Sequence, residues 1–333
     1  MHKDIFVWIE LRQNKIQDVS LQLLSEANHL QTQYKNKNIN FDVVGLITGY
    51  QTQSLYEDCF KYGADKLIVC DDIKLQEVST QHTSKAIVDI VNEYKPDSLL
   101  IGASVIGRDI APRVAARLNT GLTADATQIE VDETPDNTLL LVTRPAFGGN
   151  LFGTIVCPNT RPQMATIRPN VFEKRELNKT KNEIIHFNTT FDSSDLVKLI
   201  KHEPKLNHSI DISKARIILS AGRSMAKHMD LIQQVADELG AEVGASRGLV
   251  ETGSISKEHQ VGQTGKTVRP LVYIACGISG AVQHTAGMDK AECIIAINND
   301  PNASIFQIAH IGIVGDALTI LPQLKEELLK LKA

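Results

Sequence analysis

Four short loops in the second half of the chain combine glycine with hydroxyl side chains and one basic residue. They are SAGRSM (220–225), GASRGLV (244–250), VGQTGKTV (261–268) and CGISGAVQH (276–284). Glycine lets the backbone approach a phosphate closely, and a helix that starts at Ser279 would aim free N–H groups at a pyrophosphate. One such loop is most often only a tight turn. Four of them together predict a site for a phosphate-bearing cofactor.

The glycine spacing differs from the two commonest phosphate-binding motifs. The chain lacks the G-x-G-x-x-G of a standard NAD site. In GASVIGRD (102–109), Arg108 and Asp109 stand where a Walker loop needs Lys and Ser or Thr. A conventional NAD-dependent dehydrogenase is therefore disfavoured, and no standard ATP site is expected. We find no catalytic triad or paired acid and base, so we assign no catalytic residue.

The strands and helices that position these loops alternate in the same way in both halves of the chain. Short runs rich in Val, Ile and Leu alternate with helical stretches, which is typical of parallel strands covered by helices on both faces. In the first half we predict strands at 43–48, 66–69, 98–101 and 184–187, and helices at 54–62 and 84–94. In the second half we predict strands at 216–220, 241–243, 271–275, 293–297 and 311–314, and a helix at 231–239.

The link between the halves is a polar stretch at 170–211, and we place the domain boundary near Leu206. The predicted fold class is α/β, with two parallel-sheet α/β domains at 1–205 and 206–333. Each of the four loops of the second half lies beyond the carboxyl end of a strand, where open parallel sheets bind ligands. A closing helix at 322–333 either covers the sheet edge or docks on a partner; the sequence leaves both open.

The overall composition excludes several classes of protein. The 333 residues suit two domains, and 35 Lys and Arg against 39 Asp and Glu give a net charge of −4, which lacks the positive field of a nucleic-acid binder. No apolar stretch approaches the roughly 18 residues of a membrane span, and the run at 5–9 is too short for a secretory signal. We therefore expect a cytoplasmic protein. Five cysteines without a Cys-x-x-Cys pair predict no metal or iron–sulfur site.

Longer motifs around the loops carry a family resemblance. The segment 244–301, with GASR, QVGQTGK, YIACGISGAVQH, AGM and AINNDP, resembles the carboxyl-terminal flavin domain of the electron-transfer flavoprotein alpha subunit. The first half adds GRDIAPRVAARL (107–118), TGLTAD (120–125), TRPAFGGN (143–150) and TIRPNVF (166–172). The resemblance covers nearly the whole chain. It implies a Rossmann-like FAD-binding second domain, a first domain that packs on a beta subunit, and an electron-carrier subunit rather than a stand-alone enzyme.

The resemblance also implies which residues contact FAD. Thr264 would face the N5/O4 edge of the isoalloxazine, His284 would lie near O2, and Arg247 would sit over the ring. A reduced flavin gathers negative charge at N1 and O2, which a permanent cation such as Arg247 stabilises. Ser246, Ser279 and Asn298 would hold the pyrophosphate and ribityl region, and Asp316 the adenosine end. The full set of implied positions is Arg223, Ser246, Arg247, Val261, Gly262, Gln263, Thr264, Ser279, Gly280, Ala281, Val282, Gln283, His284, Asn298, Asp316 and Ala317.

Several of these residue types have an ordinary structural explanation. Outside the GASR context, Arg247 would be read as a surface salt-bridge residue. Cys276 is expected to be a small buried apolar residue rather than a redox thiol. Asp125 is expected to be structural. Arg113 and Arg117 are expected to form a basic stripe that either meets an acidic partner or is solvated, and we favour solvation.

Two functions remain open from the sequence. The first is a redox carrier whose FAD takes up and releases electrons singly, partnered by a beta subunit and by a flavin dehydrogenase for an acyl-CoA or a hydroxy acid. The second is an adenine-nucleotide-binding regulatory or interaction subunit without redox activity. The motifs look more like the anaerobic bacterial alpha subunits, some of which serve in electron bifurcation. Bifurcation would also need a second FAD and an NADH site, which family analogy assigns to the beta subunit.

Overall fold

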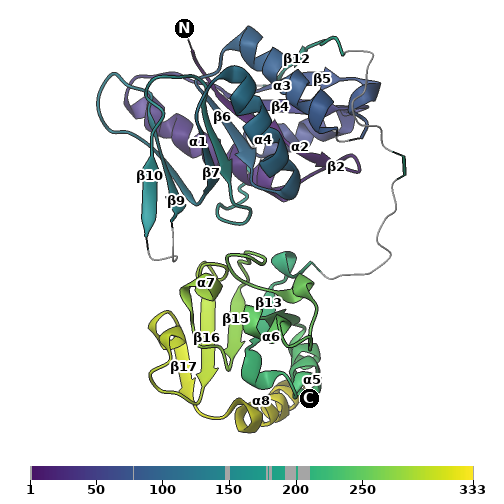
Figure 1. The fold of residues 1–333 in the computed structure, drawn as a ribbon, viewed down its shortest axis with the longest axis vertical. Helices are drawn as coiled ribbons and strands as arrows, with labels where there is room; N and C mark the ends of the chain where they lie inside the picture. The colour runs from purple at the N-terminus through teal and green to yellow at the C-terminus, as the bar shows by residue number, and fades with distance from the viewer. Residues whose placement is uncertain are drawn as a thin grey trace. The chain divides into compact units, whose positions relative to one another are not determined.

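The structure is a computed structural model that describes residues 2–77, 79–146, 151–177, 179, 182–191, 200–201 and 211–332. Two compact units emerge from it, which we call unit 1 (residues 2–146 and 151–200) and unit 2 (the described residues from 201 onward). Both are built on parallel sheets flanked by helices (Figure 1), which confirms the predicted α/β class. The boundary predicted at residues 205 and 206 lies outside the described residues and stays a prediction.

Unit 1 is centred on a seven-stranded sheet in which every neighbouring pair is parallel. The central strands are buried throughout because helices cover both faces: α1 and α2 pack on one, α3 and α4 on the other. In sheet order the strands are β12 (Glu183–His186), β5 (Lys66–Asp71), β4 (Val43–Gly49), β1 (Ile5–Ile9), β6 (Ser98–Gly102), β11 (Gln163–Ile167) and β7 (Leu122–Ala126). The helices are α1 (Asp18–Asn36), α2 (Tyr56–Lys61), α3 (Thr80–Tyr94) and α4 (Val105–Leu118).

The sequence did not predict the antiparallel parts of unit 1. A three-stranded antiparallel sheet joins β8, β9 and β10, and a two-stranded ribbon joins β2 and β3. Their bounds are Leu11–Arg12 (β2), Lys15–Ile16 (β3), Gln128–Val131 (β8), Leu140–Pro145 (β9) and Phe152–Ile155 (β10). Strands β8 and β10 have four residues each and are partly exposed, so they lack the continuous apolar runs by which parallel strands were predicted.

The switch in strand order of unit 1 falls between β1 and β6, where an open sheet forms its ligand crevice. Glu10 directly follows β1 and is fully buried. Its carboxylate accepts hydrogen bonds from Arg12 Nε at 2.9 Å and from Ser104 Oγ. Ser104 is also the N-cap of α4, where Oγ accepts the Gly107 N–H at 2.9 Å. A carboxylate of the chain itself therefore bridges the crevice of unit 1.

Unit 2 contains a five-stranded sheet, again parallel throughout. Helices α5 and α8 pack on one face, and loop residues such as Val268 and Met288 cover the other. In sheet order the strands are β14 (Glu242–Ala245), β13 (Ile217–Ala221), β15 (Val272–Cys276), β16 (Cys293–Asn298) and β17 (Ile311–Val314). The helices are α5 (Met229–Leu239), α6 (Arg247–Val250), α7 (Val282–Thr285) and α8 (Ala317–Lys332). The predicted strands and the predicted helix at 231–239 are present, with ends shifted by a few residues.

The closing helix is longer than predicted, because α8 starts at Ala317 rather than at residue 322. Leu321 is fully buried, and Leu324 packs against the same core as Ile232 of α5. The first turns of α8 therefore cover a face of the sheet rather than the sheet edge that was expected as one of its two roles. Leu328 and Leu331, also expected on its apolar side, have no described side chains.

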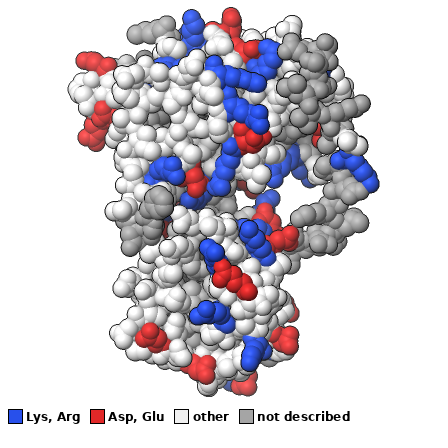
Figure 2. Space-filling view, viewed as in Figure 1, with Lys and Arg blue, Asp and Glu red and all other residues white. Residues whose placement is uncertain are grey.

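Basic and acidic side chains are interspersed on the face shown in Figure 2. Arg113 pairs with Asp109 at 3.3 Å, and Arg117 donates to Ser84 Oγ at 2.7 Å, so both arginines have partners within unit 1. Asp125 accepts two hydrogen bonds from the buried Arg168, as its expected structural role requires. Within the described ranges, none of the helices has the length and apolarity needed to cross a membrane.

Candidate functional site

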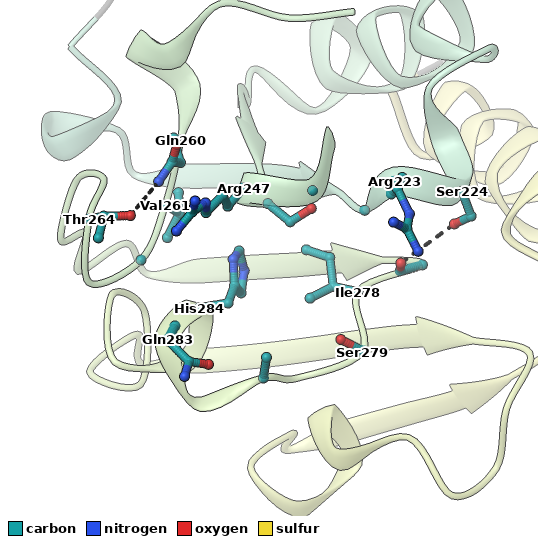
Figure 3. Close-up of a pocket in the computed structure, with 16 residues that line it drawn as sticks. Arg223, Ser224, Arg247, Gln260, Val261, Thr264, Ile278, Ser279, Gln283 and His284 are labelled. Atoms are coloured by element: carbon teal, nitrogen blue, oxygen red, sulfur yellow. Dashed lines mark hydrogen bonds between the residues drawn. The ribbon is translucent and has the colours of Figure 1, made fainter. Parts of the chain in front are cut away.

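A cavity of about 750 Å³ opens at the carboxyl ends of β13, β14 and β15 in unit 2. Its volume is within the range of small-molecule and cofactor sites. The pocket is elongated, with Thr264 at one end, Arg223 at the other, and Arg247 and His284 between them (Figure 3). The residues that line it are Gly222, Arg223, Ser224, Ser246, Arg247, Gly248, Gln260, Val261, Gly262, Thr264, Gly277, Ile278, Ser279, Ala281, Gln283 and His284.

The pocket forms where the strand order of unit 2 switches, between β13 and β15. The residue after β13 is Gly222 and the residue after β15 is Gly277, and their backbones touch. A Cβ atom on Gly222 would lie 1.9 Å from the Gly277 carbonyl oxygen. Only glycine can therefore keep these two loops together at the floor of the crevice.

The predicted helix from Ser279 is wrong. The helical turn α7 starts at Val282 and spans four residues. Gly280 has a φ of +89°, a left-handed conformation that interrupts the helix, and Ser279 O accepts a hydrogen bond from Ile305 N instead. No hydrogen bond to a described residue uses the N–H groups of Ser279, Gly280 and Ala281. An irregular loop, rather than a long helix, thus carries the free N–H donors.

His284 lines the pocket from α7 and is only 7% exposed. Its Nε2 is 2.9 Å from the hydroxyl of Tyr273, whereas its Nδ1 is buried without a hydrogen-bond partner among the described residues. Burial lowers the pKa of His284 to about 4, and the neighbouring Val261 backbone opposes that shift. The imidazole is therefore neutral at pH 7, with one nitrogen left unsatisfied. A buried polar atom of this kind points to a missing partner, such as a ligand.

Two arginines bring positive charge to the pocket. Arg247 is 70% exposed, and its Nε donates to Glu251 Oε1 at 2.7 Å, so it is a surface ion pair as well as a lining residue. It follows Ser246, whose Oγ caps α6 by accepting the Leu249 N–H. Arg223 lies at the end of the pocket distant from Thr264 (Figure 3). Together the guanidinium groups favour an anionic ligand.

The hydroxyl of Thr264 is oriented by a neighbour. Gln260 Nε2 donates to Thr264 Oγ1 at 2.9 Å, so one lone pair of the hydroxyl is already used. The hydroxyl proton of Thr264 is then available for an acceptor in the pocket. Gln260 itself is buried, and its side chain fixes the position of the end residue of the pocket.

Ten of the sixteen predicted positions line the pocket. The others are Gln263, Gly280 and Val282, within the same loops, Asn298 at the end of β16, and Asp316 and Ala317 after β17. Asn298 is buried and holds the pocket loop from behind, since its Nδ2 donates to Ile278 O at 2.9 Å and its Oδ1 accepts from Asp300 N. Asp316 is exposed and accepts the Leu318 N–H at 2.9 Å. Direct FAD contacts by these six residues stay predictions.

Six lining residues were missed from the sequence: Gly222, Ser224, Gly248, Gln260, Gly277 and Ile278. Five of them adjoin a residue that was chosen, Gly277 directly follows β15, and Gln260 belongs to the quoted QVGQTGK motif. Position directly after a strand or beside a chosen residue is the signal that could have identified them. The expectation for Cys276 holds, because this thiol is fully buried and burial raises its pKa to about 12.

Comparison with known proteins places this geometry in a family. The profile of the electron transfer flavoprotein domain matches residues 5–191, and that of the electron transfer flavoprotein FAD-binding domain matches residues 211–289. The chain belongs to the electron transfer flavoprotein family. Every residue that lines the pocket falls inside the FAD-binding match. FAD is therefore the cofactor of this electron transfer flavoprotein chain, and its function is electron transfer rather than nucleotide-dependent regulation.

Relatives that resemble this chain over nearly its whole length include alpha subunits of this family. The chain is 45% identical to the electron transfer flavoprotein subunit alpha of Thermoanaerobacterium thermosaccharolyticum, with 99% of both chains covered. It is 42% identical to the subunit alpha of Clostridium acetobutylicum, covering 97% of this chain and 96% of that one. It is also 39% identical to the lactate dehydrogenase (NAD(+),ferredoxin) subunit LctC of Acetobacterium woodii, covering 97% and 76%.

The pocket residues fit FAD on chemical grounds. The N–H groups of Ser279, Gly280 and Ala281 make no hydrogen bond to a described residue and can donate to a pyrophosphate, as in other anion-binding loops. The unsatisfied Nδ1 of His284 and the free hydroxyl proton of Thr264 suit the polar edge of a flavin ring. The positive charges of Arg223 and Arg247 complement the negative charge of FAD.

Proposed function

We propose that the pocket of unit 2 holds FAD and that the chain is the FAD-carrying subunit of a two-subunit electron carrier. Bound FAD would supply the redox chemistry, because it accepts and releases electrons singly. The observation that carries the proposal is the buried Nδ1 of His284, which lines the pocket without a partner among the described residues. In a protein that folds around a cofactor, such an atom is satisfied by the cofactor.

The side chains of the pocket bind and orient the cofactor and do no bond-making chemistry. The loop at 279–281 would hold the pyrophosphate with its free N–H groups. At the other end, Gln260 keeps the Thr264 hydroxyl oriented so that its proton is available to the ring edge. Arg247 places a permanent positive charge at the pocket, which favours an electron-rich cofactor over an electron-poor one. We find no reason to assign a residue as acid or base.

The partners we propose are a beta-type subunit and a flavin dehydrogenase, with the domain at 1–205 packing on the beta-type subunit. Names of relatives support this class of partner: one is an acryloyl-CoA reductase electron transfer subunit beta of Anaerotignum propionicum, at 39% identity. Another is the lactate dehydrogenase subunit LctC of Acetobacterium woodii. An acyl-CoA dehydrogenase or a hydroxy-acid dehydrogenase is therefore the proposed partner, and a cytoplasmic location follows from the sequence prediction.

Electron bifurcation is a finer proposal within the same function. A titration of the heterodimer with NADH and ferredoxin decides it. Reduction of a flavin by NADH, coupled to reduction of ferredoxin, would support bifurcation. Failure of NADH to reduce any flavin would refute it without affecting FAD binding by unit 2.

Flavin absorbance of the purified heterodimer, with two matched glycine variants, tests the FAD site. Gly280 and Gly253 both have positive φ, at +89° and +78°. A Cβ atom on Gly280 would lie 2.1 Å from Ile305 N, whereas one on Gly253 would meet no atom within 4 Å. We expect Gly280→Ala to lose the flavin and Gly253→Ala to keep it. A colourless wild-type protein that binds only AMP would overturn the proposal.

A further inference from the structure

Tyr273 lies behind His284, on strand β15, and is fully buried. Its hydroxyl is 2.9 Å from His284 Nε2, and this contact joins two side chains eleven positions apart. Tyr273 does not line the pocket, so it reaches the ligand only through the imidazole. The contact raises the question of which ring nitrogen carries the proton.

The neutral imidazole of His284 has one N–H, and its position is set by whichever group binds the other nitrogen. Two arrangements are possible. If Tyr273 donates to Nε2, the proton stays on Nδ1. If Nε2 donates to Tyr273, Nδ1 becomes an acceptor, and the buried phenol proton needs an acceptor elsewhere.

The surroundings of Tyr273 favour the first arrangement. Burial keeps the pKa of Tyr273 well above its usual value, while the nearby Ser220 side chain opposes that rise, so the phenol is protonated at pH 7. The Ser220 hydroxyl is buried near the phenol but is not in hydrogen-bonding geometry with a described residue, so His284 Nε2 is the better placed acceptor of the phenol proton. Among the described residues, the hydrogen-bond partner of the Tyr273 hydroxyl is His284 Nε2. Leaving a buried phenol proton unpaired would cost about 1 to 3 kcal/mol.

We propose that Tyr273 is a positioning residue that holds His284 in the tautomer with its proton on Nδ1, so that the neutral ring presents an N–H donor to an oxygen of the bound cofactor. This inference rests on the proposed FAD site and deepens it. A neutral donor near an oxygen that gains negative charge on reduction stabilises the reduced form. Tyr273 therefore raises the reduction potential of the cofactor without touching it.

The experiment compares Tyr273→Phe with Tyr34→Phe in the FAD-loaded heterodimer. Tyr34 is the matched control, because it is also fully buried and its hydroxyl donates to Thr138 O at 2.8 Å in unit 1. Three quantities are measured for each: FAD content by absorbance, the tautomer of His284 by nitrogen-15 NMR of labelled histidines, and the first reduction potential with equilibrating dyes. The histidine signals are assigned with a His284→Gln variant.

We expect the wild type to show the Nδ1–H form of His284. Tyr273→Phe should keep FAD but lose the single tautomer. Its oxidised-to-reduced ratio at a fixed ambient potential should rise three- to tenfold, which corresponds to a potential lower by about 28 to 59 mV. Tyr34→Phe should change neither the tautomer nor the potential.

Other outcomes overturn the inference and are separable from failure of the FAD site. An Nε2–H tautomer in the wild type, or an unchanged potential in Tyr273→Phe, would refute the positioning role while FAD content stays normal. Absence of FAD in the wild type would refute the proposed function instead. If Tyr273→Phe does not fold, the tautomer of His284 in the wild type still tests the inference. In the His284→Gln background, Tyr273→Phe should produce no further shift in potential, and an additive shift would show that Tyr273 acts by another route.

Discussion

Each of the two parallel sheets in this chain has a crevice where its strand order switches, and the two crevices differ. In unit 1 the crevice between β1 and β6 is bridged by Glu10, which accepts hydrogen bonds from Arg12 and Ser104. In unit 2 the crevice between β13 and β15 begins with Gly222 and Gly277 and opens into a cavity of about 750 Å³. The strand order predisposes both crevices to bind a ligand.

The difference lies in the residue that follows the first strand of each switch. A buried carboxylate next to the N-cap of α4 supplies the negative charge that a phosphate would otherwise bring to a helix N-terminus. Glycine at the equivalent place in unit 2 leaves that space open. Fold alone therefore does not assign function, and one side chain at a strand end separates a filled crevice from an open one.

Disrupting the contact between the two loops at the floor of the unit 2 crevice should have the largest effect. In Gly222→Ala the new methyl group would collide with the Gly277 carbonyl and force the two loops apart. We expect FAD affinity to fall roughly 100-fold, measured by titrating apoprotein with FAD. Gly153→Ala in unit 1, where a Cβ atom meets nothing within 4 Å, is the control and should bind FAD normally. Normal affinity in Gly222→Ala would contradict the role given to this glycine.

Acid should weaken unit 2 through His284. The unfolded chain binds a proton at this histidine below about pH 6.5, but the folded chain does so only below about pH 4. The unfolded state therefore holds more protons between these values, and stability falls as the pH is lowered through that window, by up to about 3 kcal/mol. Thermal unfolding at each pH, followed by the rise in fluorescence as FAD is released, measures this loss of stability. A His284→Gln variant should have a flatter pH dependence; an equally steep one would exclude His284 as the cause.

Removing the carboxylate of unit 1 should destabilise that unit and leave the FAD site unchanged. Glu10→Ala leaves Arg12 and Ser104 without their acceptor and should cost about 2 kcal/mol, whereas Glu10→Gln keeps an acceptor oxygen and should cost less. The single tryptophan, Trp8, is buried on the neighbouring strand β1, so its fluorescence reports unfolding of unit 1. A lower FAD affinity in Glu10→Ala would break the contrast between the two crevices.

The smallest expected effect is that of Arg247→Ala on the reduction potential. This side chain is largely exposed and forms an ion pair with Glu251, so solvent screens most of its charge. We expect the potential to fall by roughly 10 to 40 mV. Arg113→Ala removes a similar exposed pair at i,i+4 in unit 1, with Asp109, and should leave the potential unchanged. Equal shifts in both variants would indicate a general charge effect rather than one at the pocket.

Much of the fold and of the site could be predicted from local patterns. Nine of the twelve parallel strands were predicted, because burial on both faces demands continuous apolar runs, as in 43–48 and 293–297. Strands β1, β7 and β11 were not predicted. The pocket loops were recognised because glycine and hydroxyl residues follow those runs. The helix expected at Ser279 was wrong, because the left-handed Gly280 and the bond from Ile305 N belong to a loop contact that no local pattern predicts.

The sequence by itself determined the α/β class, the loops that build the site and the family. Strand periodicity, loop chemistry and motif spacing are local properties, so they can be recognised from residues that are close together in the sequence. Only the tertiary structure decided that Glu10 meets Ser104, 94 positions away, and that Tyr273 meets His284. Those contacts depend on strand order and on which face of a sheet a side chain occupies, and many distant residues set both together.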